Sequence, residues 1–239
     1  MQTALMALLL CFLMLAGCVA TTSSLTLTTT TASGTLEQIP ATMLKPEGPG
    51  PFPAIVIMHD CSGPGTRSSG APMRWARELV EKGYVIIIHD SFTPRGFAGG
   101  VCTNSSPNRN DVAPARRTPD AYAALAYLRT LPYVDGSRIG IMGGSHGGST
   151  TLASVVAAET EKEPFAQEKR TGFIAAVALF PGCAARLGEW RTVRQAGGSN
   201  QITNYIGVYK PVAPLLILIG ERDDWTPAEP CRKLTEIAR

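Results

Sequence analysis

Charged residues are absent from the beginning of this 239-residue chain, because no Asp, Glu, Lys or Arg precedes Glu37. The remainder carries 22 basic and 19 acidic side chains without a basic run, which argues against a nucleic-acid partner, since phosphate contacts need a clustered cationic face. No C-x-x-C pair and no cluster of cysteine and histidine occurs, so we expect no metal site. With 44% hydrophobic residues the chain is neither disordered nor collagen-like, and its length fits one α/β domain.

The charge-free beginning resembles an export signal. Residues 4–16 are apolar but too few to span a bilayer, which needs about 20 residues, and Leu15-Ala16-Gly17-Cys18 resembles the lipobox of bacterial lipoproteins. We therefore expect residues 1–17 to be a signal peptide and Cys18 to carry the lipid that holds the protein at a membrane of the bacterial cell envelope. The usual Lys or Arg near the N-terminus is missing, so an uncleaved anchor and an ordinary signal peptide remain alternatives.

Residues 18–35 consist largely of Thr and Ser, which predicts a low-complexity tether behind the anchor. The alternation of Leu and Thr from Leu25 to Thr28 also fits an edge strand that forms a hairpin with residues 36–44. Both interpretations leave residues 36–239 as the folded domain.

Short apolar runs alternate with helical patterns through that domain. Continuous apolar runs typical of strands buried on both faces lie at 54–58, 84–89, 138–142, 175–180 and 215–219. Helical spacing and capping residues predict helices over 71–82, 118–131 and 146–158. Repeated β-loop-α units of this kind predict an α/β fold with a doubly wound, mainly parallel sheet.

The sequence Gly143-Gly144-Ser145-His146-Gly147 matches the pattern G-x-S-x-G between a predicted strand and a predicted helix. This is the context of a nucleophile elbow, a sharp turn that exposes a serine hydroxyl at the carboxyl edge of the sheet. Glycines at 143, 147 and 148 leave room for the strained backbone. The turn would aim the first amides of the helix, beginning with that of His146, at the atom that Ser145 attacks.

Two further segments fit the same chemistry. Asp223 follows the strand at 215–219 and is the candidate acid of a catalytic triad in the chain order Ser, Asp, His, with Asp224 as the alternative. The loop after the strand at 54–58 is expected to supply a second amide to an oxyanion, from Cys61.

At this point the chain from Lys45 to Arg239 resembles the dienelactone hydrolase family of α/β-hydrolases. The resemblance is carried by the segments 45–65, 89–96, 138–148 and 219–227. It implies hydrolysis of a small ester or lactone through an acyl-enzyme, without metal or cofactor. Dienelactone hydrolases proper use a cysteine where this chain has Ser145, so a dienelactone substrate is not implied.

The resemblance also suggests residues that contact substrate. Asp60 matches an acidic residue before the oxyanion donor, and Trp225 lies beside the candidate acid. Arg95 lies near the position at which the family has an arginine that binds the carboxylate of the substrate. A structural ion pair between Arg95 and Asp90 is the alternative. We expect the loop 184–210 to shape the pocket through Trp190, Tyr205 and Tyr209.

Four cysteines outside the export signal allow three disulfide pairings, and the sequence alone does not choose among them. In the implied fold Cys61 and Cys102 follow neighbouring strands, as do Cys183 and Cys231. We therefore expect disulfides 61–102 and 183–231, with free, partly buried thiols as the alternative.

The expected triad has no histidine. His59, His89 and His146 all precede or adjoin the serine, and none follows Asp223, where the family has one more helix and strand. We therefore expect an incomplete α/β-hydrolase domain, truncated relative to a complete hydrolase and nearly inactive. A degenerate hydrolase that acts as a lipid-anchored binding protein, and a peptidase or acyltransferase on the same fold, are the alternative functions.

Overall fold

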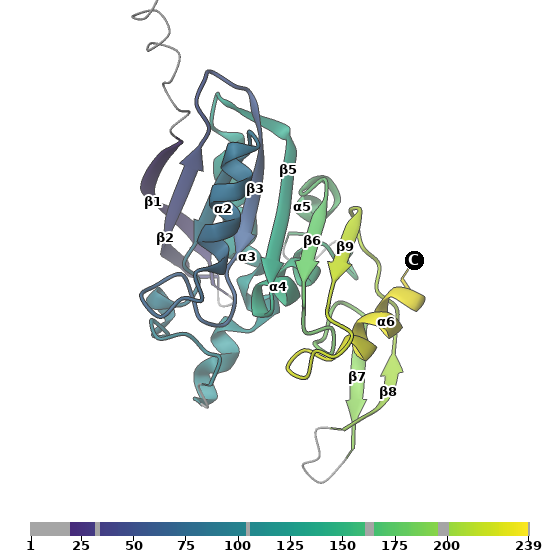
Figure 1. Cartoon of the computed structure of the whole chain (residues 1–239). Coiled ribbons are helices and arrows are strands. Elements are labelled where there is room, and N and C mark those ends of the chain that lie inside the picture. The colour runs from purple at the N-terminus through teal and green to yellow at the C-terminus, as the bar shows by residue number, and fades with distance from the viewer. Residues whose placement is uncertain (1–19, 32–33, 104–105, 161–164, 196–200, 239) are drawn as a thin grey trace, which may run out of the picture.

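The computed structural model describes residues 20–31, 34–103, 106–160, 165–195 and 201–238. A seven-stranded sheet in the order β1-β2-β4-β3-β5-β6-β9 forms its centre (Figure 1). Its strands are β1 (Thr21–Thr30), β2 (Leu36–Lys45), β3 (Phe52–Met58), β4 (Val85–His89), β5 (Val134–Gly144), β6 (Ala176–Leu179) and β9 (Leu215–Leu218). A separate two-stranded hairpin is formed by β7 (Arg191–Arg194) and β8 (Ile202–Ile206).

The direction of the strands follows from their composition. β3, β4, β5, β6 and β9 are parallel and mostly apolar, and all five side chains of β4 are buried. β1 and β2 form an antiparallel hairpin at one edge, with β2 antiparallel to β4. The predicted doubly wound, mainly parallel α/β sheet is thus confirmed.

Helices cover both faces of the sheet. They are α2 (Ala71–Glu81), α3 (Thr118–Arg129), α4 (His146–Ser154), α5 (Ala166–Thr171) and α6 (Ala228–Glu236). α2 packs Ala76 and Val80 on Ile57, whereas α3 packs Leu125 on Val56, the next residue of β3. Because successive side chains of a strand point to opposite faces, α2 and α3 lie on opposite sides (Figure 1).

Of the two interpretations of the Thr-rich segment, the edge strand is confirmed, because β1 pairs with β2 along its whole length and Thr21–Thr30 is not a tether. Two other expectations about local structure were wrong. The helix after the elbow ends at Ser154, and Val156 instead forms a bridge with Pro211. β9 was read as an interior strand, but it is the edge of the sheet in the described part of the chain, and Leu216 and Leu218 on it are half exposed.

The segment 184–210 is not a simple pocket loop. It contains the hairpin of β7 and β8, and Trp190 and Tyr209 are fully buried in a core that also includes Leu152 and Leu234. The indole N–H of Trp190 donates to the carbonyl of Cys183 at 2.7 Å. These two aromatic side chains therefore anchor the segment instead of lining the pocket.

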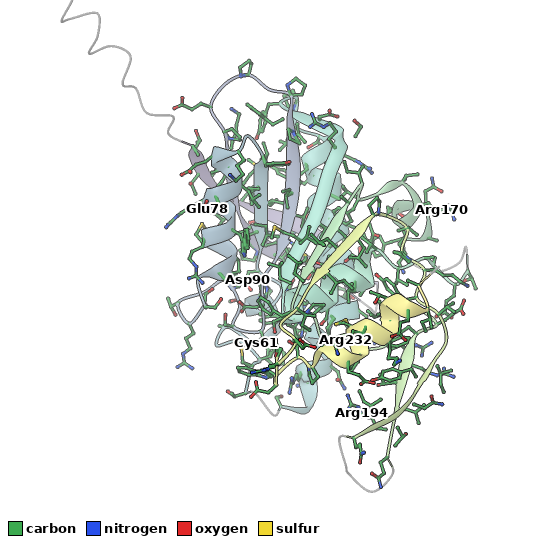
Figure 2. All side chains as sticks on the ribbon, turned by 45° about the vertical axis from the view of Figure 1, so that its right-hand side comes forward. Cys61, Glu78, Asp90, Arg170, Arg194 and Arg232 are labelled. Atoms are coloured by element: carbon green, nitrogen blue, oxygen red, sulfur yellow. A yellow bond between two sulfur atoms is a disulfide. The ribbon has the colours of Figure 1, made fainter. Side chains whose placement is uncertain are left out.

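Two disulfides join the loops at the carboxyl edge of the sheet. Cys61 is bonded to Cys102, and Cys183 is bonded to Cys231 of α6, which confirms the expected pairing. Figure 2 labels Cys61 and Asp90, which lie in the loops after β3 and β4. The signal region, including Cys18, lies outside the described residues, and none of the described helices has the length and hydropathy to span a membrane.

Candidate active site

Ser145 is the single residue that connects the end of β5 to the first residue of α4. Its backbone has φ 53° and ψ −118°, a combination rarely adopted by a residue with a side chain and typical of a strained functional turn. Its amide donates to the carbonyl of Leu179 at 2.9 Å, which ties the turn to the neighbouring strand β6. The serine is partly exposed, and its hydroxyl has no hydrogen-bond partner in the described part of the chain.

Glycines allow α4 to start directly against the sheet. A Cβ on Gly147 would overlap the carbonyl oxygen of Met58 and lie 2.7 Å from that of His59. A Cβ on Gly148 would lie 2.9 Å from the carbonyl oxygen of Leu179. The beginning of α4 is therefore wedged between the ends of β3 and β6, and a larger residue at either position would force the helix away.

The backbone amides of His146 and Cys61 are the two candidate oxyanion donors. His146 is the first residue of α4, so its N–H has no acceptor within the helix. Cys61 lies two residues beyond His59, whose carbonyl is part of the contact with Gly147. The Cys61 amide also has no acceptor among the described residues, while its carbonyl accepts from Val101 at 2.6 Å. Both candidate oxyanion donors thus belong to segments in contact with one another.

Asp223 lies in the loop after β9, at the same edge of the sheet as Ser145 because both strands are parallel. Its carboxylate accepts from the amides of Trp225 and Thr226 and from the Thr226 hydroxyl, at 2.7–3.0 Å. These bonds, the amide of Thr226 first, lower the pKa of Asp223. Asp223 is therefore ionised and shapes its own loop, whereas Asp224 is exposed.

The other expected substrate contacts differ in their surroundings. The carboxylate of Asp60 accepts from the amide and hydroxyl of Ser62 and from the Ser69 hydroxyl, so it organises the loop that carries Cys61. Trp225 is 75% exposed. Beside it is a cavity of about 780 Å³, lined by residues 224–227, Gly182, Cys183, Arg109 and Arg194 among others.

Arg95 is part of a buried ion-pair network with partners other than the expected Asp90. Its guanidinium donates to Asp120 at 2.7 and 2.8 Å and to Glu37 at 2.6 and 2.9 Å. These carboxylates outweigh the effect of burial and raise the pKa of Arg95. Asp90 instead accepts from the amides of Phe92 and Thr93. With its donors engaged by two carboxylates and the Ser91 carbonyl, Arg95 joins β2 to α3.

None of the three histidines is placed as a general base. His59 is fully buried: its Nδ1 donates to the Asp60 carbonyl at 2.8 Å, and its Nε2 accepts from the Ser91 amide at 3.2 Å. His89 is also fully buried, and burial lowers its pKa to about 4. His146 has its Nδ1 within 2.8 Å of Nη1 of Arg117, and burial together with that charge lowers its pKa to about 3.

Sequence reasoning missed Arg117, the residue that contacts His146. It follows Arg116 in a short turn over Pro114–Arg117, and the sequence gives no sign that one arginine is exposed and the other fully buried. Among the described residues, no group of three or more His, Cys, Asp and Glu side chains is arranged to hold a metal ion.

The sheet order, the strained serine between β5 and α4, and the acid after a later parallel strand define an α/β-hydrolase fold with a nucleophile elbow. The model of the dienelactone hydrolase family matches residues 39–239. The chain belongs to the dienelactone hydrolase family.

Individual relatives are more distant. The curated protein YcjY of Escherichia coli K12, itself uncharacterised, is 35% identical over 105 residues, which are 44% of this chain and 31% of YcjY. A candidate dienelactone hydrolase from Klebsiella pneumoniae has a TM-score of 0.59 at 19% identity, over 91% of this chain and 83% of that structure. A dienelactone hydrolase-like promiscuous phosphotriesterase, P91 from metagenomic libraries, has a TM-score of 0.55 at 18% identity, over 90% and 75% of the two chains. Both structures support the fold.

The contact of α4 with β3 can be tested by adding one methyl group. Gly147→Ala should lower the free energy of unfolding by at least about 2 kcal/mol and displace the turn at Ser145, because its Cβ would meet backbone atoms that cannot rotate away. Urea denaturation measures the loss. Gly65→Ala is the control, since its Cβ would be 3.6 Å from the nearest atom. Equal stability of the two variants would show that α4 does not touch β3 in this way.

Stability should fall steeply between pH 6.5 and about pH 4. The native pKa of all three histidines is lowered, so the unfolded chain binds protons in this range that the native protein does not, and stability decreases as pH falls. Each ring contributes up to about 1.4 kcal/mol per pH unit.

Urea midpoints at pH 8, 7, 6 and 5 would measure this slope. His89→Leu removes one titrating ring whose two nitrogens have no partner in the described structure, and it should reduce the slope by about one third. A stability that is constant from pH 7 to pH 5 would contradict the buried, neutral state of these rings.

Proposed function

We propose that this protein is a serine hydrolase that cleaves ester or lactone bonds of small molecules through an acyl-enzyme on Ser145. The observation that carries the proposal is the strained backbone of Ser145 at the strand-to-helix turn, ahead of the free amides of α4. Membership of the dienelactone hydrolase family supports the reaction class. The cavity beside residues 224–227, in the loop that carries Asp223, has the size to hold a small molecule, and Ser145 is not among the residues that line it.

In this proposal the Ser145 hydroxyl attacks the carbonyl carbon of the ester, and the carbonyl oxygen becomes an oxyanion. The amides of His146 and Cys61 donate to that oxygen, and such donors lower the barrier because the charge develops only in the transition state. Asp223 is ionised, and its three hydrogen bonds leave further lone pairs that can accept from a histidine N–H. Water then hydrolyses the acyl-enzyme and regenerates the serine.

The proton of Ser145 has no acceptor among the described histidines, His59, His89 and His146. Because the loss of the histidine of such a triad costs on the order of 10⁶ in turnover, we propose that the described residues alone hydrolyse esters slowly. The same observation favours a second function, that of a binding protein that retains the fold and the cavity of a hydrolase.

A fluorophosphonate probe distinguishes the two functions. It should label Ser145 covalently, at a low rate because no described histidine is placed as its base, and Ser145→Ala should abolish labelling at unchanged stability. Mass spectrometry of the labelled peptide identifies the site. Ser137→Ala, which removes an exposed serine before the buried part of β5, should label as the wild type does. A folded wild-type protein that takes up no probe would favour the binding function.

As to cellular location, we propose that the protein is exported and held at a membrane by a lipid on Cys18. The apolar stretch at 4–16, followed at once by Gly17-Cys18, supports this location. In a bacterial host, Cys18→Ser should move the protein from the membrane fraction to the soluble or unprocessed fraction. Cys11→Ser, within the signal, is the control. A Cys18→Ser variant that remains in the membrane as a mature protein would contradict lipidation.

A further inference from the structure

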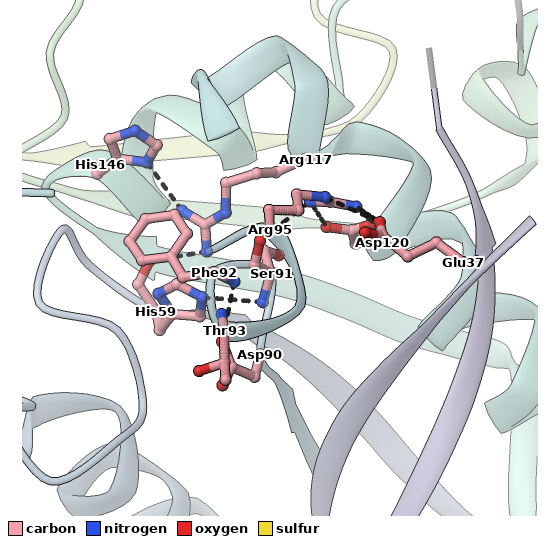
Figure 3. Close-up of polar contacts among 10 residues, drawn as sticks. All are labelled: Glu37, His59, Asp90, Ser91, Phe92, Thr93, Arg95, Arg117, Asp120 and His146. Atoms are coloured by element: carbon pink, nitrogen blue, oxygen red, sulfur yellow. Dashed lines mark hydrogen bonds and ion pairs between the residues drawn. The ribbon is translucent and has the colours of Figure 1, made fainter. Parts of the chain in front are cut away.

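Arg117 is a fully buried arginine whose hydrogen-bond partners in the described structure are two neutral groups. Its Nη1 contacts the His146 Nδ1 at 2.8 Å, and its Nη2 donates to the His59 carbonyl at 3.0 Å (Figure 3). The guanidinium also lies over the ring of Phe92, with its carbon 4.9 Å from the ring centre. Arg95, in contrast, directs its charge to two carboxylates.

This arrangement is costly for stability. A buried charge without a paired carboxylate is unfavourable, and a side chain such as methionine would fill similar space without that cost. Burial lowers the pKa of Arg117 to about 9, with partial compensation from the charge of Asp120. Since Asp120 already accepts two hydrogen bonds from Arg95, it does not neutralise Arg117 directly.

Both partners of Arg117 lie next to a candidate oxyanion donor. His59 directly follows β3, at the start of the loop that carries Cys61, and His146 directly follows the proposed nucleophile Ser145. Phe92 also contacts both histidines. Its ring packs edge-on against each imidazole, with distances between ring centres of 4.4 Å to His59 and 5.6 Å to His146. One guanidinium therefore bridges the two segments that supply the oxyanion amides.

On the basis of the proposed hydrolase function, we propose that Arg117 is a positioning residue: it locks the Cys61 and His146 segments together and fixes the His146 ring as an Nε2–H donor beside Ser145. The tautomer follows from hydrogen-bond chemistry. Arginine has only donors, so the Nδ1 that it contacts is the unprotonated nitrogen, and a neutral imidazole then carries its proton on Nε2. With its Nδ1 lone pair in contact with Arg117 and its proton on Nε2, the neutral His146 ring is not a base.

Nitrogen-15 NMR of the histidine rings tests the pairing without any need for activity. In the wild type, one ring, assigned with His146→Gln, should be a pure Nε2–H tautomer that does not titrate from pH 8 to pH 5. The charged groups that face it are Arg117 and, from the preceding turn, Arg109. In Arg117→Met the pKa of His146 should rise by at least one unit, and the Nδ1–H tautomer should become populated.

The rate of fluorophosphonate labelling tests the effect on the site. Loss of one oxyanion donor in a serine hydrolase costs about 10²–10³ in rate, so loss of the residue that positions two donors should slow labelling about tenfold or more, with little change in probe half-saturation. Arg117→Lys should recover only part of the rate, because a single ammonium does not reproduce the two-pronged contact. Arg116→Met, the exposed neighbour, should label at the wild-type rate.

Two results would overturn the proposal: a wild-type His146 that titrates near pH 6.5 or carries its proton on Nδ1, and a folded Arg117→Met protein with an unchanged His146 ring and labelling rate. The first needs no Arg117 variant, so it decides the question even if Arg117→Met does not fold. A wild type that shows the expected ring but takes up no probe would overturn the hydrolase function and leave the Arg117–His146 pairing in place.

Discussion

The contact between the first turn of α4 and the end of β3 determines the geometry of the whole site. Gly147 packs against the carbonyl groups of Met58 and His59 so closely that no Cβ would fit, which fixes the position of the first turn of α4. Ser145 must then turn sharply out of β5, which gives its positive φ. The same contact brings the loop after β3 beside the helix N-terminus, where unpaired amides already favour negative charge.

Much of this could be predicted from sequence, because it is local or follows from the order of elements. The run AIVIM at 54–58 predicts a strand buried on both faces without knowledge of its neighbours, and the glycines around Ser145 predict a tight turn. The disulfides 61–102 and 183–231 could be predicted once the fold was assumed, since strand order brings those loops together. The predicted loss of stability in acid has no such signal in the sequence, because only the structure shows that the histidines are buried.

The predictions from sequence that were wrong concern contacts between segments that are distant along the chain. Arg95 pairs with Glu37, 58 positions away, because β1 and β2 form an edge that places Glu37 near α3. Trp190 and Tyr209 were expected in a pocket, and their burial depends on α4 and α6 packing around them. Nothing in the pair Arg116–Arg117 indicates which arginine is buried, since that depends on the loops after β3, β4 and β5 meeting above the sheet.

Arg95 and Arg117 show two different surroundings for a cation near one edge of the sheet. Arg95 is neutralised by Glu37 and Asp120, and its network holds β2 against α3. Arg117 lies in the turn that leads into α3. Its guanidinium contacts two neutral groups, the imidazole of His146 and the carbonyl of His59. A purely structural cation would gain more from a carboxylate, as Arg95 does. The two contacts of Arg117 instead join the loop after β3 to the first residue of α4, which is the positioning role proposed for it.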